Sequence, residues 1–209
     1  MNALPLLSSA ALTLRAPEQL LLPDILSADP LIGLFYVIYP DPVAAASLAR
    51  LAHRLRDKFG LRGRPLATDR FHATLHHFDH YYGLRMDYVE LACEAAAKIS
   101  VPSFRVVFDR VMCFRRSPGD WTLVMRGDNR LTALKNLRQE LGVALKKTSL
   151  GRKVKKQFTP HVTLLYDHQE VGELEVEPVS WTVSEFALVQ SLIGQTKHIP
   201  LGRWPLRGS

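Results

Sequence analysis

The tetrapeptide His-x-Thr-Leu occurs twice in this chain, at residues 72–75 and again at residues 161–164. Each copy lies in a short apolar run that follows a basic stretch, which predicts a strand entered from a loop. Because residues i and i+2 share one face of a strand, each histidine is grouped with its threonine, and each leucine faces the other way. If the two strands lie side by side, two imidazoles and two hydroxyls meet in one cleft.

The rest of the sequence alternates between strand and helix patterns. Helices are predicted from Asp41 to Gly60, from Asp87 to Ile99, and from Asp128 or Asn129 through Leu145. Strands are predicted at 31–39, 71–78, 103–114, 120–128, 158–167, 179–192 and 198–206. Similar strands and helices precede both tetrapeptides, which favours an internal duplication of a small α/β unit. Residues 1–30 show no sustained period and are predicted to form a loosely packed extension, so the folded domain is expected to span residues 31–209.

Charge and cysteine content narrow the class of protein. The formal net charge of +7 favours an anionic partner such as nucleic acid or a nucleotide, although a basic surface also serves solubility. Cys93 and Cys113 lie in apolar patterns without Cys-x-x-Cys spacing, which argues against a disulfide framework or a structural zinc site. The apolar segment 1–14 is too short to span a bilayer, which needs about 18 apolar residues. We therefore expect a cytoplasmic protein with no membrane partner.

The paired motif suits the hydrolysis of a phosphodiester without a metal. A neutral imidazole can accept a proton from an attacking water, and an imidazolium can donate one to the departing oxygen. Threonine hydroxyls can donate hydrogen bonds to the non-bridging phosphate oxygens. His72 and His161 are thus the candidate catalytic pair, with Thr74 and Thr163 as the candidate phosphate-binding pair.

These motifs resemble those of the two-histidine (2H) phosphoesterase superfamily, in particular the RNA 2′,3′-cyclic phosphodiesterases that are also called 2′-5′ RNA ligases. The resemblance rests on "HATL", "PHVTL", "LFYVIYPD", "FALVQSL" and "LGRWPL", and it covers about residues 31–207. It implies an α+β fold of two pseudo-symmetric lobes, each an antiparallel sheet with helices outside, around a central cleft. It also implies that His72 protonates the leaving 3′ oxygen and that His161 activates water, which yields a 2′-phosphate.

The sequence departs from the family pattern beside both motifs. Tyr166 stands where the family often has arginine, and His77 begins a segment that is often aromatic, aliphatic and glycine in the family. Strand parity predicts that His76 shares the cleft face with His72, whereas His77 points to the opposite layer. Further candidate cleft residues are His76, Tyr166, Arg70 and Lys156, the last two from the basic stretches that precede the motifs.

Several functions remain compatible with these residues. The leading hypothesis is a cofactor-free, monomeric cyclic phosphodiesterase that acts on RNA ends with a 2′,3′-cyclic phosphate or on small cyclic nucleotides. The same residues would serve 2′-5′ RNA ligation or an ADP-ribose 1″,2″-cyclic phosphodiesterase. A non-catalytic module that binds RNA or nucleotides is the alternative from a different class. A metal hydrolase built on His76, His77, Asp79 and His80 with His72 is disfavoured, because strand parity spreads these side chains over both faces.

Overall fold

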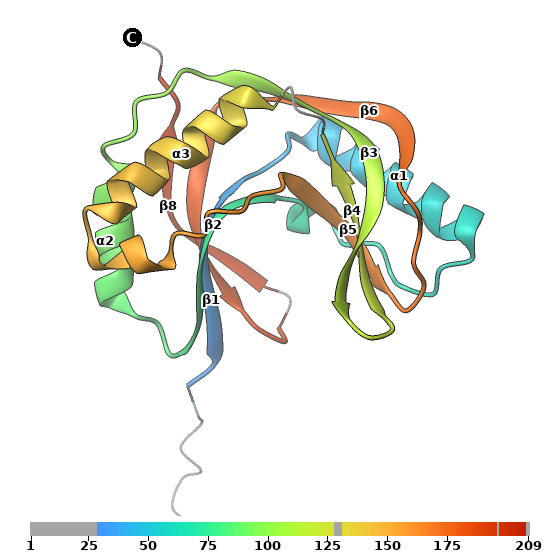
Figure 1. The fold of residues 1–209 in the computed structure, drawn as a ribbon, viewed down its shortest axis with the longest axis horizontal. Helices are drawn as coiled ribbons and strands as arrows, with labels where there is room; N and C mark the ends of the chain where they lie inside the picture. The colour runs from blue at the N-terminus through green and yellow to red at the C-terminus, as the bar shows by residue number, and fades with distance from the viewer. Residues whose placement is uncertain (1–28, 128–130, 196, 208–209) are drawn as a thin grey trace, which may run out of the picture.

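Two four-stranded antiparallel sheets form the framework of the computed structural model, which describes residues 29–127, 131–195 and 197–207 (Figure 1). The first sheet has the order β2-β1-β7-β8 and contains β1 (Leu31–Ile38), β2 (Ala73–Tyr82), β7 (Glu185–Leu192) and β8 (Lys197–Pro205). The second sheet has the order β5-β4-β3-β6 and contains β3 (Phe104–Ser117), β4 (Asp120–Arg126), β5 (His161–Asp167) and β6 (Leu174–Val183). This arrangement confirms the predicted α+β fold.

The two sheets repeat the same connection. In each, a central strand leads through a long helix to an antiparallel edge strand, first as β1-α1-β2 and later as β4-α3-β5. A third strand, β7 or β3, pairs with the other side of the central strand. The two edge strands β2 and β5 carry the two His-x-Thr-Leu motifs and contact each other across the gap between the sheets. The motif strands therefore lie side by side, and the shared topology supports the predicted duplication.

Helix α1 (Pro42–Phe59) begins and ends where the sequence predicts. The carboxylate of Asp41 accepts a hydrogen bond from the backbone N–H of Ala44 at 2.8 Å, and Gly60 ends the helix with a φ of 63°. Helix α2 (Met86–Ala96) is shorter at its C-terminal end than predicted, and α3 comprises Thr132–Lys146. The predicted start of α3 at residues 128 or 129 lies outside the described residues, as do residues 1–28 of the predicted extension.

Each long helix contacts the sheet that does not contain the strand before it. Helix α1 follows β1 of the first sheet but packs against β5 and β6 of the second sheet. Helix α3 follows β4 of the second sheet and contacts β2 of the first sheet as well as β3 of its own sheet (Figure 1). The buried leucines of α1 and α3 belong to one continuous hydrophobic core. The two lobes are thus interlocked by an exchange of helices.

Both motif strands contain a β-bulge at the leucine of the motif. Along β2, Thr74 pairs with Val37 and His76 pairs with Tyr36, which leaves Leu75 as the extra residue. Along β5, Thr163 pairs with Val124 and Leu165 pairs with Leu123, which leaves Leu164 as the extra residue. The repeat of this irregularity at the same motif position is further evidence of the duplication.

The carbonyl oxygen of each bulge residue accepts a hydrogen bond from the other lobe. The oxygen of Leu75 accepts one from Nε of Arg138 on α3, at 3.2 Å. The oxygen of Leu164 accepts one from the backbone N–H of Leu66, in the loop before β2, at 2.8 Å. Each lobe therefore holds the irregular part of the partner lobe's motif strand in place.

The bulge in β2 overturns the predicted orientation of His76 and His77. Leu75 and His76 both face the helix layer, where the side chain of His76 is only 4% exposed. His77 instead faces the gap between the sheets, where its ring stacks on Phe35 with the centroids 5.9 Å apart. Simple alternation fails here because the bulge adds one residue and reverses the parity of the strand beyond it.

The run 179–192 forms two strands that belong to different sheets. Strand β6 ends at Val183 and β7 begins at Glu185, so the chain passes from the second sheet back to the first at Ser184. Within the described part of the chain, no helix is both long enough and apolar enough to cross a bilayer.

Candidate active site between the two sheets

His72 lies immediately before β2, and its ring is held on two sides. Its Nδ1 is 2.8 Å from the carbonyl oxygen of Arg70, and its ring stacks on Phe35 with the centroids 5.6 Å apart. Because a carbonyl can only accept, Nδ1 carries the proton and Nε2 is the free nitrogen of the neutral ring. Burial lowers the pKa of His72 from 6.5 to about 4, and the nearby charges of Arg70 and His161 add to this effect.

His161, the first residue of β5, repeats this arrangement. Its Nδ1 is 2.7 Å from the carbonyl oxygen of Thr159, which is again the residue two positions earlier. The edge of its ring meets Phe114 with the centroids 5.0 Å apart. Burial lowers the pKa of His161 below its usual 6.5. Both histidines are therefore fixed in the same tautomer by equivalent backbone contacts.

Two adjoining cavities join these histidines. One, of about 360 Å³, is lined by His72, Thr74 and Thr163 among others. The next, of about 220 Å³, is lined by His161 and shares Thr74 and His77 with the first. Within the described residues, neither threonine hydroxyl has a hydrogen-bond partner. The structure thus brings all four motif residues together around one cleft and leaves both hydroxyls available to a ligand.

Arg70 and Tyr166 line the cavity of His72, as two of the candidate cleft residues. The Nε and Nη1 atoms of Arg70 are buried and lack a hydrogen-bond partner within the described part of the chain. Buried N–H groups without a partner are costly, so these two are suited to an anion in the cavity. Tyr166 is about half exposed, and the guanidinium of Arg116 lies 5.0 Å from the centre of its ring.

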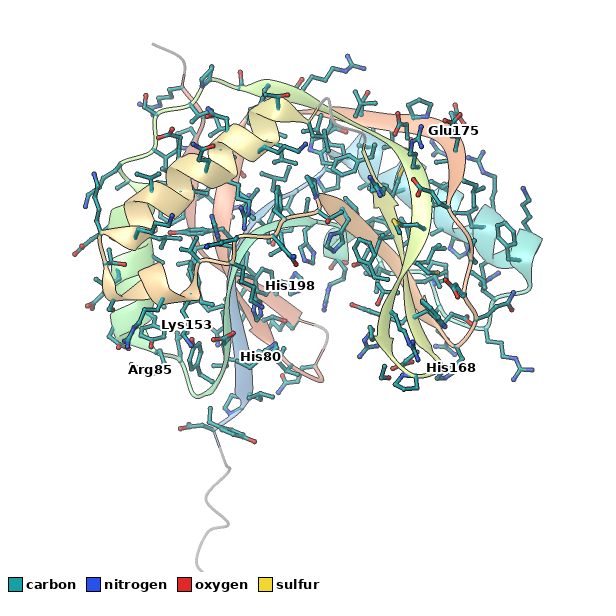
Figure 2. The ribbon with its side chains drawn as sticks, viewed as in Figure 1. His80, Arg85, Lys153, His168, Glu175 and His198 are labelled. Atoms are coloured by element: carbon teal, nitrogen blue, oxygen red, sulfur yellow. The ribbon has the colours of Figure 1, made fainter. Side chains whose placement is uncertain are left out.

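His198 on β8 also lines this cavity, although no motif in the sequence singles it out (Figure 2). Its ring meets that of His72 edge to face, and its Nδ1 is buried without a partner among the described residues. Burial, together with the charges of His72 and Arg70, lowers the pKa of His198 from 6.5 to about 4. Ser191 pairs with His198 between β7 and β8 and is likewise buried beside the cavity. The strand order of the first sheet, which sequence patterns do not reveal, brings both residues to the site.

Two other candidate cleft residues lie apart from His72. The Nε2–H of His76 donates to the carbonyl oxygen of Arg138 on α3 at 2.8 Å, and His76, although buried, lines the cavity of His161. Lys156 lines a neighbouring hollow over α3. Across residues 29–127, 131–195 and 197–207, no three histidine, cysteine or acidic side chains converge as metal ligands.

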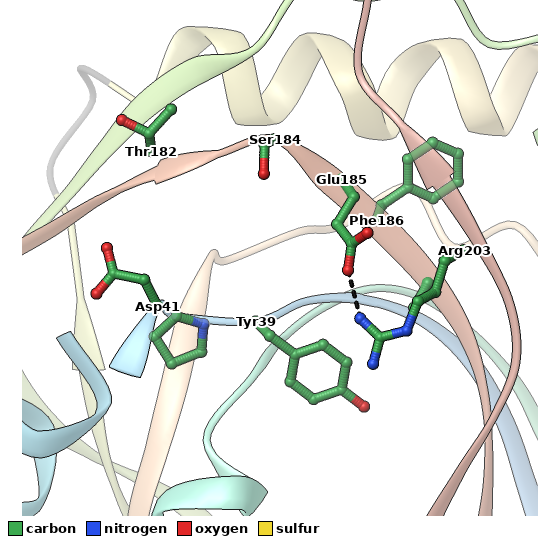
Figure 3. A pocket seen from close by; sticks show the side chains of 9 residues that line it. Tyr39, Asp41, Thr182, Ser184, Glu185, Phe186 and Arg203 are labelled. Carbon is green, nitrogen blue, oxygen red and sulfur yellow. Dashed lines mark hydrogen bonds and ion pairs between the residues drawn. The ribbon is translucent and has the colours of Figure 1, made fainter. Parts of the chain in front are cut away.

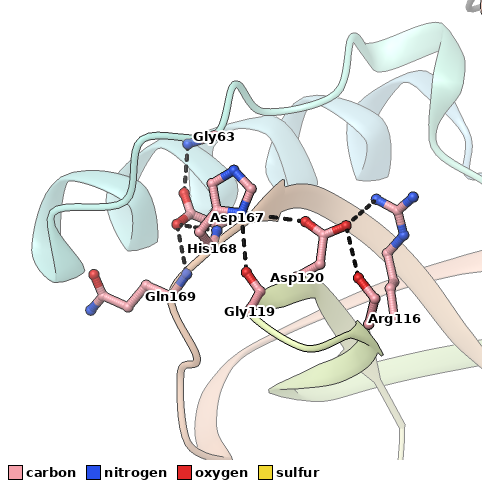
Figure 4. A network of polar contacts seen from close by, with 8 residues as sticks. Gly63, Arg116, Gly119, Asp120, Asp167, His168 and Gln169 are labelled. Carbon is pink, nitrogen blue, oxygen red and sulfur yellow. Dashed lines mark hydrogen bonds and ion pairs between the residues drawn. The ribbon is translucent and has the colours of Figure 1, made fainter.

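A network around Asp167 anchors the end of β5 to the loop before β2 (Figure 4). The carboxylate of Asp167 accepts hydrogen bonds from the backbone N–H groups of Gly63 at 2.6 Å and Gln169 at 3.0 Å. Burial favours a higher pKa for Asp167, but these hydrogen bonds outweigh it and keep the pKa below its usual value. A side chain at Gly63 would place its Cβ only 1.9 Å from the carbonyl oxygen of Tyr166. The loop can therefore approach the strand of the second motif only with glycine at this position.

Another hollow, of about 230 Å³, lies beside the start of α1 and is lined by Tyr39, Asp41, Glu185 and Arg203 among others (Figure 3). The guanidinium of Arg203 is paired with the carboxylate of Glu185, so its charge is already balanced. None of the four motif residues lines this hollow. The cleft between the motif strands is therefore the stronger candidate.

Comparisons with known proteins agree with this geometry. The model of the 2′-5′ RNA ligase superfamily matches residues 10–194, and it begins inside the segment that the sequence predicts to be an extension. Escherichia coli LigT in its apo form is similar in structure, with a TM-score of 0.65 and 25% identity over 85% of this chain and 99% of LigT. LigT complexed with 3′-AMP gives a TM-score of 0.62 and 26% identity over 85% of this chain and 98% of LigT.

A protein from Thermus thermophilus, TT0787, shares the fold. Its TM-score is 0.63, with 21% identity over 85% of this chain and 99% of that protein. None of the curated protein sequences compared with the chain matches it.

Proposed function

Because this chain belongs to the 2′-5′ RNA ligase superfamily of 2H phosphoesterases, we propose that it is a metal-independent phosphodiesterase that opens 2′,3′-cyclic phosphates. The observation that carries the proposal is the equivalent pair of imidazoles, each holding a backbone carbonyl through Nδ1 and each beside a threonine without a partner. The substrate would be the cyclic end of an RNA or a small cyclic nucleotide, and the product a 2′-phosphate.

In the proposed reaction, Nε2 of His161 accepts a proton from a water molecule whose oxygen attacks the phosphorus. The bond from phosphorus to the 3′ oxygen breaks in line with this attack, and Nε2–H of His72 protonates the departing oxygen. The hydroxyls of Thr74 and Thr163 donate to the non-bridging oxygens, where negative charge must be held. At the end of the reaction, His161 is protonated and His72 is neutral. Proton exchange with solvent restores the starting states.

The acid in this scheme needs a proton that His72 lacks in the free protein at neutral pH, since burial lowers its pKa to about 4. A phosphate bound beside Nε2 places negative charge near the ring and favours the protonated form. We therefore expect the substrate to promote protonation of His72. The unpartnered guanidinium of Arg70 would attract the same anion.

The LigT structures support a nucleotide ligand. Escherichia coli LigT, about a quarter identical to this chain, has been solved with 3′-AMP and with phosphate. The same fold there accommodates a nucleoside monophosphate, which supports the proposed binding of one phosphate between Thr74 and Thr163. The reverse reaction, 2′-5′ ligation of RNA, would use the same groups, as would hydrolysis of an ADP-ribose 1″,2″-cyclic phosphate.

The decisive experiment treats the protein with EDTA and measures turnover of 2′,3′-cyclic AMP, of RNA with a cyclic end and of ADP-ribose cyclic phosphate. Phosphorus NMR identifies the product, which we expect to be the 2′-phosphate. His72→Ala and His161→Ala should each lower kcat by about 10² to 10⁴, the typical contribution of one proton transfer. His53→Ala, on the exposed face of α1, is the matched control and should retain full activity.

Near-normal turnover in both histidine variants would refute the proposal. Tight binding of a 2′-phosphonucleotide by the wild-type protein, with no turnover of any cyclic phosphate, would instead support a non-catalytic binding module. Activity that EDTA removes and zinc restores would point to a metal hydrolase.

A further inference from the structure

The hollow over α3, with a volume of about 730 Å³, is larger than either cavity of the cleft. Its lining includes no acidic residue, and it contains a concentration of positive charge. The cationic side chains that line it, which together we call the basic groove, are Lys135, Arg138, Lys146, Lys155 and Lys156.

The basic groove adjoins the candidate active site. Arg138, Lys155 and Phe158 line both the groove and the cavity that contains His161. That cavity in turn shares Thr74 with the cavity of His72. A ligand that occupies both the cleft and the groove would cross this shared wall.

The lysines of the groove are not neutralised by neighbouring carboxylates. All four are exposed, and none forms an ion pair with an acidic side chain in the described parts of the chain. Other cations on the surface are paired, for example Arg110 with Glu175 and Lys153 with Asp79. Like charges that share one hollow repel each other, so the groove is electrostatically complementary to a polyanion.

Arg138 has a different role, because backbone carbonyls occupy its guanidinium. It donates to the carbonyl oxygens of Leu75, Lys155 and Gln157. It thereby ties α3 to the bulge of β2 and to the segment that leads into β5. The guanidinium also lies 4.5 Å from the centre of the Phe158 ring, which fixes the wall shared by groove and cleft.

We infer that the basic groove binds the sugar-phosphate backbone of an RNA strand whose cyclic phosphate end lies between Thr74 and Thr163. This inference rests on the proposed function and extends it, since it makes a polynucleotide, rather than a free cyclic nucleotide, the preferred substrate. Because the cavity of His72 offers only Arg70 as a cation, the upstream polyanion is drawn toward the groove.

The test compares two substrates in the full-length protein: 2′,3′-cyclic AMP and a single-stranded RNA of about ten nucleotides with a 2′,3′-cyclic end. The test variant is Lys135→Gln with Lys146→Gln, both on α3 and both outside the cavities of the motif residues. The control variant is Lys58→Gln with Lys98→Gln, which removes the same charge from exposed positions elsewhere. Thermal unfolding of each variant checks that the fold is retained.

We expect the test variant to lower kcat/KM for the RNA about tenfold and to leave kcat/KM for cyclic AMP within about twofold. For the RNA, the negative slope of log kcat/KM against log salt concentration should become smaller in magnitude by about 1 to 2, because the variant neutralises fewer phosphates. The control variant should change neither value. Equal losses in the test and control variants, or equal kcat/KM for the two substrates in the wild-type protein, would overturn the inference.

Failure of the proposed function can be told apart from failure of this inference. If the wild-type protein turns over neither substrate, the proposed function is wrong, and the groove is then tested by binding alone. Fluorescence anisotropy with a labelled RNA that ends in a 2′-phosphate should show weaker binding by the test variant than by the control. Identical affinity of the two variants in that measurement would also overturn the inference.

Discussion

The imidazole rings of His198 and His72 meet edge to face, with their centroids 5.0 Å apart and their planes at 76°. The pKa of each side chain is lowered to about 4, mainly by burial, and the charge of His72 contributes to the lowered pKa of His198. Two imidazolium rings at this distance would repel each other, so the pair favours at most one proton. The candidate acid thus has a competitor for its proton within the same cavity.

Replacing His72 by phenylalanine keeps the ring contact and removes the charge of His72. Because that charge lowers the pKa of His198, we expect His72→Phe to raise the pKa of His198. Carbon-13 NMR of labelled histidines measures this shift, with His168→Phe at an exposed position as the control. An unmoved titration of His198 would contradict a direct coupling of the two rings.

Ligand binding is expected to change the protonation of His72. With a pKa of about 4, its imidazole is neutral in the free protein at pH 7. A bound 2′-phosphonucleotide should raise this pKa by a unit or more, because the anion stabilises the imidazolium. Carbon-13 NMR of labelled histidines, assigned with His72→Gln, would follow the titration with and without the nucleotide. Superimposable titration curves would show that the phosphate lies away from His72.

The two threonine hydroxyls are expected to act on the phosphate and to contribute little to folding. Thr74→Val and Thr163→Val preserve side-chain shape and should each lower kcat/KM about tenfold to a hundredfold, the worth of one hydrogen bond to a charged group. Thr122→Val is a matched control, because Thr122 is a buried strand residue that lines neither cavity of the cleft. If the control lost as much activity as the motif variants, the hydroxyls would have only a structural role.

Gly63 is expected to be intolerant of any side chain. Gly63→Ala would force its Cβ to within 1.9 Å of the Tyr166 carbonyl oxygen, so the loop must move and the hydrogen bond to Asp167 must weaken. We expect the free energy of unfolding, measured with urea, to fall by about 1 to 3 kcal/mol. Gly172→Ala provides the control, since a Cβ at that position meets no atom within 4 Å. Equal stability of the two variants would argue against this close approach.

Burial of His76 predicts a loss of stability in acid. Its pKa is about 4 in the folded protein and about 6.5 in the unfolded chain, so between these values only the unfolded chain is protonated. Stability is therefore fully present above about pH 6.5 and falls as the pH decreases toward 4. His76→Gln should reduce the loss between pH 7 and pH 5 by about 2 kcal/mol, as measured by urea unfolding. The exposed His53→Gln should leave the loss unchanged.

The sequence alone was sufficient to predict that the four motif residues lie together between two strands, and which elements carry them. The helical spacing of apolar residues and the capping residues predict α1 accurately, because the N-cap at Asp41 and the left-handed conformation of Gly60 depend only on neighbouring residues. The orientation of His76 and His77 was predicted wrongly, because a bulge depends on how β2 pairs with β1. A strand pairing between residues almost 40 positions apart has no local signature, and the same holds for the matching bulge at Leu164.

The neighbours of the motif residues were the part that could not be predicted. His198 follows His72 by more than a hundred residues and reaches it only because β8, β7 and β1 are adjacent in one sheet. Arg138 reads as a polar residue on the outer face of a helix, yet its guanidinium is held by three backbone carbonyls. Such contacts depend on which sheet each helix covers, and amphipathic periodicity leaves that choice open.

The exchange of helices between the sheets has a consequence for how the protein unfolds. Pulling the lobes away from each other would strip α1 from β5 and β6 and α3 from β2, and would expose the apolar face of both sheets at once. Neither lobe can therefore melt while the other persists, and the chain should unfold in a single calorimetric transition.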